Sequence, residues 1–192
     1  MNFLPFDPAV SQWFESLRVE PVTFIMKVLS WSAGGFLILL PLLAFWLWRR
    51  HTKFRFAVVF AFGLGIIINN LVIDTVKVNV SRPRPCEAGV VEAAYPTMIN
   101  PKKPHRSFPS GHSGNSIGAI ILALWLWPKV KPWLLVFPFL IGISRIYLGA
   151  HYLSDVLAGW VIGAIMCNVL GFIFWKVLNK LKPRLDHTPE TA

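Results

Sequence analysis

The sequence predicts an all-α membrane protein: a bundle of about five transmembrane helices, preceded by a short helix at the membrane surface. The chain of 192 residues is 55% hydrophobic and only 15% charged, whereas an average soluble domain is about 25% charged. Its mean hydropathy is +0.55. Five long apolar runs follow one another, each close to the roughly 20 residues that a helix needs to cross a bilayer. These observations exclude a water-soluble enzyme, a disordered chain and a disulfide scaffold.

The first element, within residues 1–21, is predicted to be an interfacial helix. Asp7 and Pro8 are typical of a helix start, with the acid as the cap and proline at the first helical position. Four apolar side chains then fall on one helical face: Val10, Trp13, Phe14 and Leu17. We expect residues 8–18 to form an amphipathic helix that lies in the membrane interface. The alternative is an ordinary helix with one face in water.

The five apolar runs are predicted to be the membrane spans. They cover residues 22–48, 54–76, 110–127, 133–149 and 151–178. The fourth is at the short limit, because about 17 residues are the least that cross a bilayer. A long outer loop, 77–109, separates the second run from the third, and residues 179–192 form a tail. Nothing divides the chain, so we expect one integral membrane domain over 1–192, with its bundle at 22–178.

Basic residues orient this bundle. Ten of the 19 Lys and Arg residues lie in short connections or at span ends on one side: Arg49, Arg50, Lys53, Arg55, Lys129, Lys131, Lys176, Lys180, Lys182 and Arg184. The positive-inside rule makes this side cytoplasmic. Six tryptophans at the same ends are typical of an aromatic belt: Trp46, Trp48, Trp125, Trp127, Trp133 and Trp175. We therefore expect a multi-pass protein of the cell inner (plasma) membrane, with its tail inside and its N-terminus and 77–109 loop on the periplasmic side.

The net charge of +10 is explained by this topology together with an anionic substrate. Nucleic acid is not an expected partner, because no hydrophilic domain is present to carry a surface that binds it. The expected partners are the lipid bilayer and an anionic lipid. The sequence carries no signal for an oligomeric state.

Three short stretches place polar residues at the outer ends of the predicted spans. They are Lys77 with Arg84-Pro85, Pro109 to His112, and Ser144-Arg145 with His151 and Asp155. In the predicted topology all three meet at the same membrane face. Ionisable residues in such places are by default a functional hypothesis, so we expect the functional site at this face.

Five of these residues are predicted to bind phosphate. Lys77, Arg84 and Arg145 are three cations that converge on one place, which is stable only if an anion neutralises them. Arginine forks suit the oxygens of phosphate. Ser110 and Gly111 open a helix, where free N–H groups and the helix dipole favour an anion, and glycine lets the backbone approach the ligand closely. The sequence therefore predicts a phosphate site.

The remaining residues are candidates for catalysis. His151 and Asp155 are four apart, on one face of the opening turn of the fifth span. A carboxylate there can hold one ring nitrogen and leave the other free as a nucleophile, while His112 is available as a general acid. The alternative is a zinc site built from the same three side chains, but three neighbouring cations disfavour a divalent metal.

Together the three stretches form a pattern that resembles a known family. The pattern KxxxxxxRP–PSGH–SRxxxxxHxxxD, over residues 77–155, is similar to that of the type-2 phosphatidic acid phosphatases, the lipid phosphate phosphatase superfamily. The resemblance implies that Lys77, Arg84, Ser110, Gly111 and Arg145 bind phosphate. It implies that His151 attacks phosphorus to form a phosphohistidine, that His112 protonates the leaving group, and that Asp155 orients His151. It implies no metal and no cofactor, and six spans as an alternative to five.

The substrate that this resemblance implies is a lipid phosphate or pyrophosphate at the outer membrane face. The first choice is undecaprenyl pyrophosphate, since the compact chain looks like the small bacterial diphosphatases of the family. The same site would serve phosphatidylglycerol phosphate, phosphatidic acid or the 1-phosphate of lipid A. Two other classes stay open: a lipid phosphotransferase that uses an acceptor alcohol, and a non-catalytic protein that only binds lipid phosphates.

Other polar residues receive no catalytic role. Lys102, Lys103, His105 and Arg106 precede the Pro109 stretch and are expected to face the anionic membrane surface or to hold a second phosphate. Five residues inside the second and third runs are expected to bond between helices: Asn69, Asn70, Ser113, Asn115 and Ser116. Asp74 precedes Lys77 by one turn, and we expect the two to pair.

Overall fold

The computed structural model describes residues 3–31, 53–94, 106–127 and 130–186. Every element in these ranges is helical, which confirms the predicted all-α class. In chain order the elements are α1 (Asp7–Ser16), α2 (Glu20–Ser30), α4 (Lys53–Val80), α5 (Gly111–Leu126), the 3-10 helix η2 (Pro132–Leu135), α6 (Val136–Tyr147) and α7 (Leu153–Asp186).

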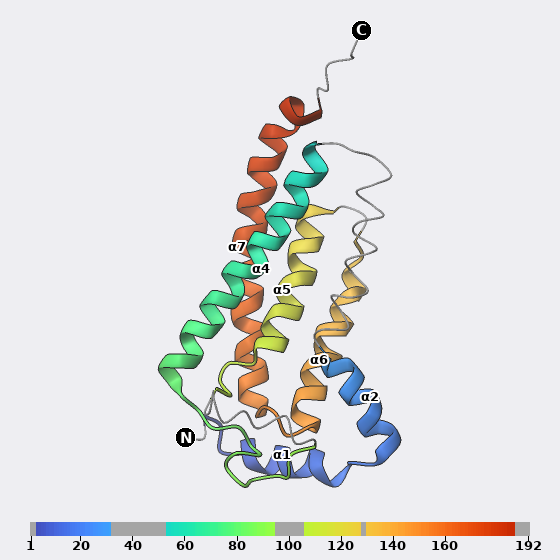
Figure 1. Ribbon diagram of the computed structural model, residues 1–192, viewed down its shortest axis with the longest axis vertical. Helices are drawn as coiled ribbons and strands as arrows, with labels where there is room; N and C mark the ends of the chain where they lie inside the picture. Colours follow the sequence, from blue (N-terminus) through green and yellow to red (C-terminus); the bar gives the residue numbers. More distant parts are fainter. Residues whose placement is uncertain (1–2, 32–52, 95–105, 128–129, 187–192) are drawn as a thin grey trace.

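Four helices form an elongated bundle (Figure 1). α4, α5, α6 and α7 run along its long axis, and α5 contacts each of the other three. α1 lies across one end of the bundle, and α2 packs beside α6 near that end. We call the end covered by α1 the α1 end. The opposite end, where α7 stops, is called the tail end.

The N-terminal helix α1 forms where a helix was predicted, but its first residue differs from the prediction. Phe6 occupies the cap position without a side-chain hydrogen bond, and Asp7 is the first helical residue. The prediction of Asp7 as the cap was therefore wrong. Its carboxylate is fully buried and pairs with Arg82 instead, because burial of a charge requires a partner.

The apolar face of α1 is divided between the protein and its surroundings. Phe14 packs against a buried cluster of Tyr147, Leu148 and Ala150 at the α1 end. Trp13 is 58% exposed. An exposed tryptophan on a helix that lies across the end of an apolar bundle is typical of a membrane interface.

Among the described residues, two helices are long and apolar enough to cross a membrane, Phe56–Val80 and Leu153–Pro183. Only 28% of the most apolar window of each is buried in the protein, whereas the core helix of a soluble protein is mostly buried. α5 has 16 residues, and Pro132–Tyr147 is a shorter apolar helix. α2 begins where the first predicted span was expected, but residues 32–48 of that span lie outside the described residues.

Two helices continue beyond their predicted ends. α4 was expected to stop at residue 76 but continues to Val80, where Ser81 takes a positive φ of 48° and Pro83 follows. α7 was expected to stop at 178 but continues to Asp186, so the predicted tail is helical at its start. Apolar runs mark the part of a helix that faces lipid, whereas helix ends depend on residues that break the helix. Lys77 therefore lies in the last turn of α4 rather than in the loop.

Glycines set the closest helix contact, between α5 and α7. A Cβ atom on Gly159 would lie 2.5 Å from the carbonyl oxygen of Ser110, and one on Gly163 would collide with the carbonyl of Gly114. Gly159 and Gly163 are four residues apart, so one face of α7 is smooth where α5 crosses it. Small residues with this spacing let helix backbones approach in membranes. The contact fixes the beginning of α5 against the beginning of α7.

Polar side chains bond α4 to α5 inside the bundle. Asn69 donates to Asn115 Oδ1 at 2.8 Å, and Asn115 donates to Asn70 Oδ1 at 2.9 Å. These bonds confirm the predicted role of the three asparagines. The prediction was wrong for Ser113 and Ser116, whose hydroxyls bond within their own segment, to Ser110 Oγ and to the Ser113 carbonyl.

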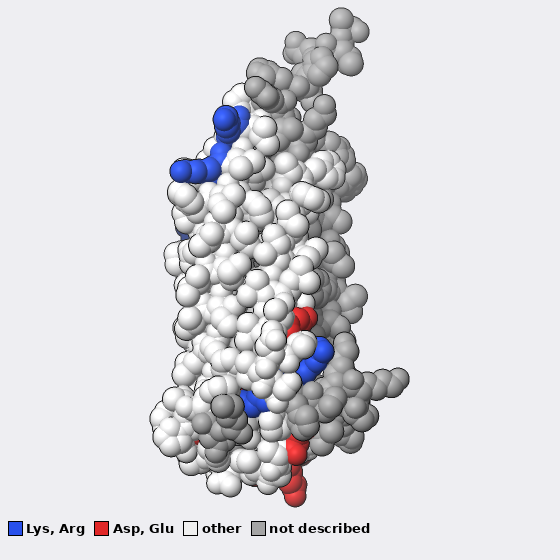
Figure 2. Space-filling view, turned by 90° about the vertical axis from the view of Figure 1, so that its left-hand side faces the viewer, with Lys and Arg blue, Asp and Glu red and all other residues white. Residues whose placement is uncertain are grey.

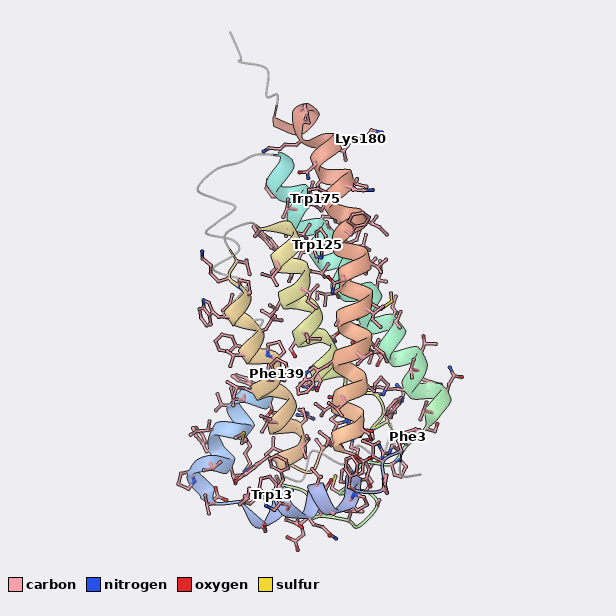
Figure 3. All side chains as sticks on the ribbon, turned by 180° about the vertical axis from the view of Figure 1, so that it is seen from behind. Phe3, Trp13, Trp125, Phe139, Trp175 and Lys180 are labelled. Atoms are coloured by element: carbon pink, nitrogen blue, oxygen red, sulfur yellow. The ribbon has the colours of Figure 1, made fainter. Side chains whose placement is uncertain are left out.

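The two ends of the bundle differ in composition from its middle. Figure 2 shows charged side chains near the two ends and a largely uncharged band between them. Trp125, Trp175 and Lys180 lie toward the tail end, whereas Phe3 and Trp13 lie at the α1 end (Figure 3). Trp125, Trp175 and Lys180 were predicted to share one side, and they lie together toward the tail end. Five other members of that predicted set lie outside the described residues: Trp46, Trp48, Arg49, Arg50 and Lys129.

Candidate active site

The three polar stretches meet at the α1 end, although they come from four different helices. The last turn of α4, the first turn of α5, the last turn of α6 and the first turn of α7 all lie at this end (Figure 1). The predicted convergence of the three stretches is therefore a feature of the fold.

Lys77 lies against the beginning of α5. A Cβ atom on Gly111 would come within 2.9 Å of Lys77 Nζ, so the ammonium group occupies space that only glycine leaves free. Asp74 lies 3.8 Å from the same nitrogen, which confirms the predicted pairing. Lys77 also lies within electrostatic reach of Arg84, Arg145 and Arg106.

The two arginines come from different elements. Arg84 follows α4, and its Nη1 donates to the Ala150 carbonyl at 3.4 Å. Arg145 lies in the last turn of α6, is buried, and donates to Ser30 of α2. Both arginines act electrostatically on His112 and on His151. Three cations and two histidines are thus neighbours at one place.

Ser110 and Gly111 form a helix N-terminus, as predicted. Ser110 is the N-cap of α5, and its hydroxyl oxygen accepts a hydrogen bond from the Ser113 N–H at 3.4 Å. The Ser110 N–H donates to the Asp155 carbonyl at 2.9 Å, which joins α5 to α7. The beginning of α5 lies next to the Lys77 ammonium group, so the positive end of the helix dipole adds to the positive charge there.

His151 lies in the connection between α6 and α7, because α7 begins only at Leu153. The predicted place in the opening helical turn was therefore two residues too early. The imidazole is buried, and its Nδ1 is 3.7 Å from Asp155 Oδ2. That distance is too long for a hydrogen bond, and Nδ1 has no hydrogen-bond partner among the described residues. The structure thus brings the pair together without closing the predicted bond.

The electrostatic surroundings keep His151 uncharged. Burial lowers its pKa well below the usual value, and the positive charges of Arg84 and Arg145 lower it further. Both effects disfavour the imidazolium form. A neutral imidazole retains a lone pair, which is what a nucleophile requires.

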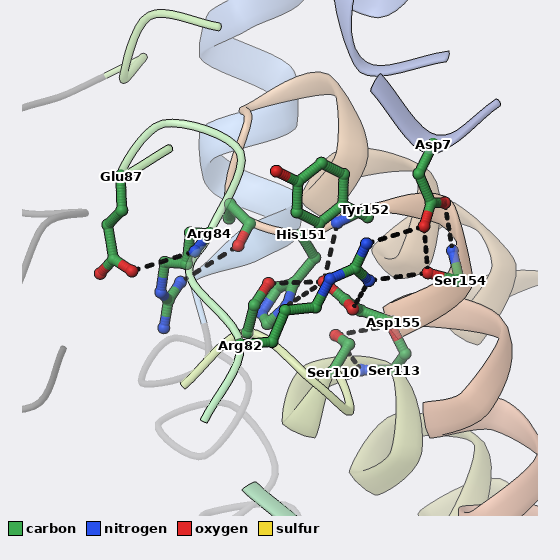
Figure 4. Close-up of polar contacts among 12 residues, drawn as sticks. Asp7, Arg82, Arg84, Glu87, Ser110, Ser113, His151, Tyr152, Ser154 and Asp155 are labelled. Atoms are coloured by element: carbon green, nitrogen blue, oxygen red, sulfur yellow. Dashed lines mark hydrogen bonds and ion pairs between the residues drawn. The ribbon is translucent and has the colours of Figure 1, made fainter. Parts of the chain in front are cut away.

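Asp155 is held by groups that the sequence analysis did not assign (Figure 4). Its Oδ1 accepts from Arg82 Nη1 at 2.5 Å, and its Oδ2 accepts from Ser107 Oγ at 2.5 Å and from the Tyr152 N–H at 2.9 Å. The only sequence signal for Arg82 is its place in the Arg-Pro-Arg-Pro run at 82–85. Ser107 had no signal, because its contact depends on how the loop before α5 returns to α7.

The structure describes only one of the four basic residues that precede the Pro109 stretch. Lys102, Lys103 and His105 lie outside the described residues, while Arg106 is close enough to act on Lys77. Among the described residues, no three His, Cys, Asp or Glu side chains are grouped as metal ligands would be. The chemistry that this donor set supports is anion binding next to a neutral histidine.

Known proteins resemble this chain. Residues 54–180 match the family described as the PAP2 superfamily. The chain is 35% identical over 151 residues to the undecaprenyl-diphosphatase BcrC of Bacillus subtilis, covering 77% of this chain and 70% of that protein. The chain is also 29% identical over 123 residues to an undecaprenyl-diphosphatase of Sulfolobus acidocaldarius. That match covers 62% of this chain and 54% of the relative.

A solved structure gives the same result in three dimensions. The crystal structure of a transmembrane PAP2-type phosphatidylglycerolphosphate phosphatase from Bacillus subtilis superimposes with a TM-score of 0.64 and 26% identity, covering 91% of this chain and 85% of that one. The matched region contains every residue of the candidate site from Lys77 to Asp155. The chain therefore belongs to the PAP2 superfamily, a family of lipid phosphatases.

Proposed function

We propose that this PAP2 phosphatase hydrolyses undecaprenyl pyrophosphate to undecaprenyl phosphate and inorganic phosphate at the outer face of the membrane. The observation that carries the proposal is the convergence of three cations, a helix N-terminus and two histidines at one end of an apolar bundle. The 35% identity to a Bacillus undecaprenyl-diphosphatase favours this lipid over others.

The first half of the reaction assigns a role to each residue. The terminal phosphoryl group lies among Lys77, Arg84, Arg145 and the N–H groups at Ser110 and Gly111, which neutralise its oxygens. The neutral His151 attacks phosphorus, so that a P–N bond forms while the bond to the bridging oxygen breaks. His112 gives its proton to that oxygen, and undecaprenyl phosphate leaves.

The second half regenerates the enzyme. His112, now neutral, takes a proton from water, and the resulting oxygen nucleophile breaks the P–N bond to release inorganic phosphate. Asp155 orients His151 and stabilises the positive charge that the phosphorylated ring carries. Each step uses side chains of the chain itself, so we expect the reaction to need no metal ion and no other cofactor.

The proposed topology completes the account. α4, α5, η2 with α6, and α7 span the membrane, and α1 lies at the outer interface. The site at the N-terminus of α5 then lies at the outer face, near the lipid phosphates. The chain is then a single domain of the inner (plasma) membrane, with the site on the periplasmic side. The tail end of the bundle lies in the cytoplasm.

A second candidate substrate is phosphatidylglycerol phosphate. The solved relative that covers most of this chain is named as a phosphatidylglycerolphosphate phosphatase. All the proposed contacts address the phosphoryl group alone, so the lipid portion decides between the two substrates by how it lies against the bundle.

The experiment that tests the proposal is phosphate release by the purified protein in detergent, with EDTA present. Undecaprenyl pyrophosphate, phosphatidylglycerol phosphate, phosphatidic acid and lipid A are compared, with His151→Ala as the control. We expect release that survives EDTA, is lost in the variant and is fastest with undecaprenyl pyrophosphate. Faster release from phosphatidylglycerol phosphate would favour the second candidate. Product that forms only with an acceptor alcohol would indicate phosphotransfer.

A further inference from the structure

The catalytic carboxylate is connected to the N-terminal helix through one buried arginine. We propose that Arg82 and Asp7 are positioning residues for Asp155. Asp7 binds one arm of Arg82, the other arm binds Oδ1 of Asp155, and Oδ2 therefore stays available to His151. The inference rests on the roles proposed above for Asp155 and His151. It adds that α1 takes part in catalysis by fixing this carboxylate, besides lying at the membrane interface.

Contacts with several neighbouring groups hold Arg82 in place. The side chain is 2% exposed, and its guanidinium carbon lies 4.0 Å from the centre of the Tyr152 ring and 4.9 Å from that of Phe3. Two aromatic rings therefore pack against the guanidinium group. Arg82 also connects to the loop before α5, because its carbonyl accepts from the Ser107 N–H at 2.9 Å.

The two arms of the guanidinium group go to different carboxylates (Figure 4). Nη1 donates to Asp155 Oδ1 at 2.5 Å, and Nη2 donates to Asp7 Oδ2 at 2.8 Å. Ser154 completes the connection: its N–H donates to Asp7 Oδ1 at 3.0 Å, and its hydroxyl lies within hydrogen-bond distance of both Arg82 and Asp7. All of these groups are buried, so their geometry is not set by water.

The binding of two carboxylates by different nitrogens of Arg82 has a chemical consequence. An arginine with a single carboxylate partner tends to pair with both of its oxygens. Because Asp7 occupies Nη2, Arg82 contacts Asp155 through Nη1 and Oδ1. Oδ2 then faces Ser107, the Tyr152 N–H and His151, whose Nδ1 is 3.7 Å away. A small approach of the two groups closes the hydrogen bond when the histidine becomes positive. Without Asp7, Nη2 loses this carboxylate partner and can draw Oδ2 away from the ring.

The chain offers a matched control on the same helix. Glu15 of α1 also ties this helix to the rest of the protein: it accepts from the Glu92 N–H at 2.6 Å and from Arg18 at 3.3 Å. Glu15 makes no contact with Arg82 or Asp155 among the described interactions. Glu15→Gln therefore weakens the docking of α1 alone, whereas Asp7→Asn weakens docking and also removes the charged partner of one arm of Arg82.

The experiment compares kcat and KM for lipid phosphate hydrolysis in wild type, Asp7→Asn, Glu15→Gln and Arg82→Lys, with thermal unfolding of each protein as the check on folding. We expect Asp7→Asn to lower kcat by about 10- to 100-fold, because small misplacements of catalytic groups have effects of that size. KM should stay within about twofold, since neither residue touches substrate. Arg82→Lys keeps the charge but loses one arm, and should lower kcat similarly.

A second comparison distinguishes positioning from docking. In an Asp155→Asn background, Asp7→Asn should change kcat by less than about twofold, because effects that act through one group are not additive. Glu15→Gln should stay within about threefold of its parent in both backgrounds. Equal losses in Asp7→Asn and Glu15→Gln would overturn the proposal, as would a rise in KM with unchanged kcat or full additivity with Asp155→Asn. Failure of these tests leaves the proposed reaction intact, whereas activity in His151→Ala would remove the reaction itself.

Discussion

The two ends of the bundle are stabilised in different ways. At the tail end, Val58, Ala61, Leu126 and Leu178 form a buried apolar cluster, covered by aromatic side chains that include Trp125 and Phe174. At the α1 end, the most deeply buried side chains include charged and polar ones from distant parts of the chain: Asp7, Arg82, His151 and Asp155. Apolar packing tolerates small changes in volume, whereas a buried ionic network depends on every member.

Because of this difference, stability depends mainly on the tail end of the bundle and the proposed catalysis depends on the α1 end. The tail end holds the helices together and contacts no proposed substrate group. The α1 end carries the proposed chemistry and is itself stabilised by ion pairs that the chemistry uses. Changes at the two ends should therefore act on different measurements, and the following variants test that separation, from the largest expected effect to the smallest.

His151→Ala should have the largest effect on activity. Removal of the nucleophile prevents the covalent step, so we expect a loss of at least about 10⁴-fold in kcat. The thermal unfolding temperature should change little, because the replaced ring leaves no charge unpaired. Phosphate release and unfolding are measured on the same preparation. Substantial turnover in this variant would show that the α1 end works by another mechanism.

Asp155→Asn should come second. The amide cannot stabilise the positive ring of the phosphorylated histidine, and we expect kcat to fall by on the order of 10³-fold. The variant should also unfold at a lower temperature, because Arg82 loses one of its two carboxylate partners. A loss of activity without any loss of stability would contradict the view that catalysis and stability share this network.

Gly163→Val tests the contact between the two regions. The new side chain would collide with the Gly114 carbonyl and push α5, which carries Ser110 to His112, away from α7. We expect a stability loss of roughly 1–3 kcal/mol and a fall in kcat of up to about 10²-fold from the displaced groups. Gly63→Ala is the matched control, since a Cβ at Gly63 meets nothing within 4 Å. Equal behaviour of the two variants would refute the packing argument.

Leu178→Ala should affect activity least. Truncation of this buried leucine opens a cavity at the tail end and should cost about 2–5 kcal/mol of stability. Activity per folded molecule should stay within about threefold of wild type, because the α1 end is unchanged. Denaturation in detergent measures the loss of stability, and kcat is measured at a temperature below the unfolding transition. A loss of kcat larger than the loss of folded protein would mean that the two ends are coupled.

The same contrast explains how far the sequence predicted the structure. The sequence predicted the apolar bundle and the convergence of the motifs that carry the eight proposed site residues, because each motif lies at a helix end and the helix ends meet. Asp7 was interpreted as a cap, since local sequence cannot show that residue 82 lies beside it. Helix ends at 76 and 178 were placed too early, because hydropathy marks lipid contact rather than helix length. The His151–Asp155 hydrogen bond was expected from spacing, whereas the loop position of His151 leaves 3.7 Å between the two atoms.

The most direct test of the central claim is to trap the phosphoenzyme. The protein is mixed with undecaprenyl pyrophosphate labelled in its terminal phosphate, quenched with denaturant at alkaline pH, where a P–N bond survives, and digested for mass spectrometry. We predict a covalent phosphate on His151 that appears within the first turnover, is lost in acid and is absent from His151→Ala. Full turnover with no label on His151, or with a label on another residue, would contradict the account.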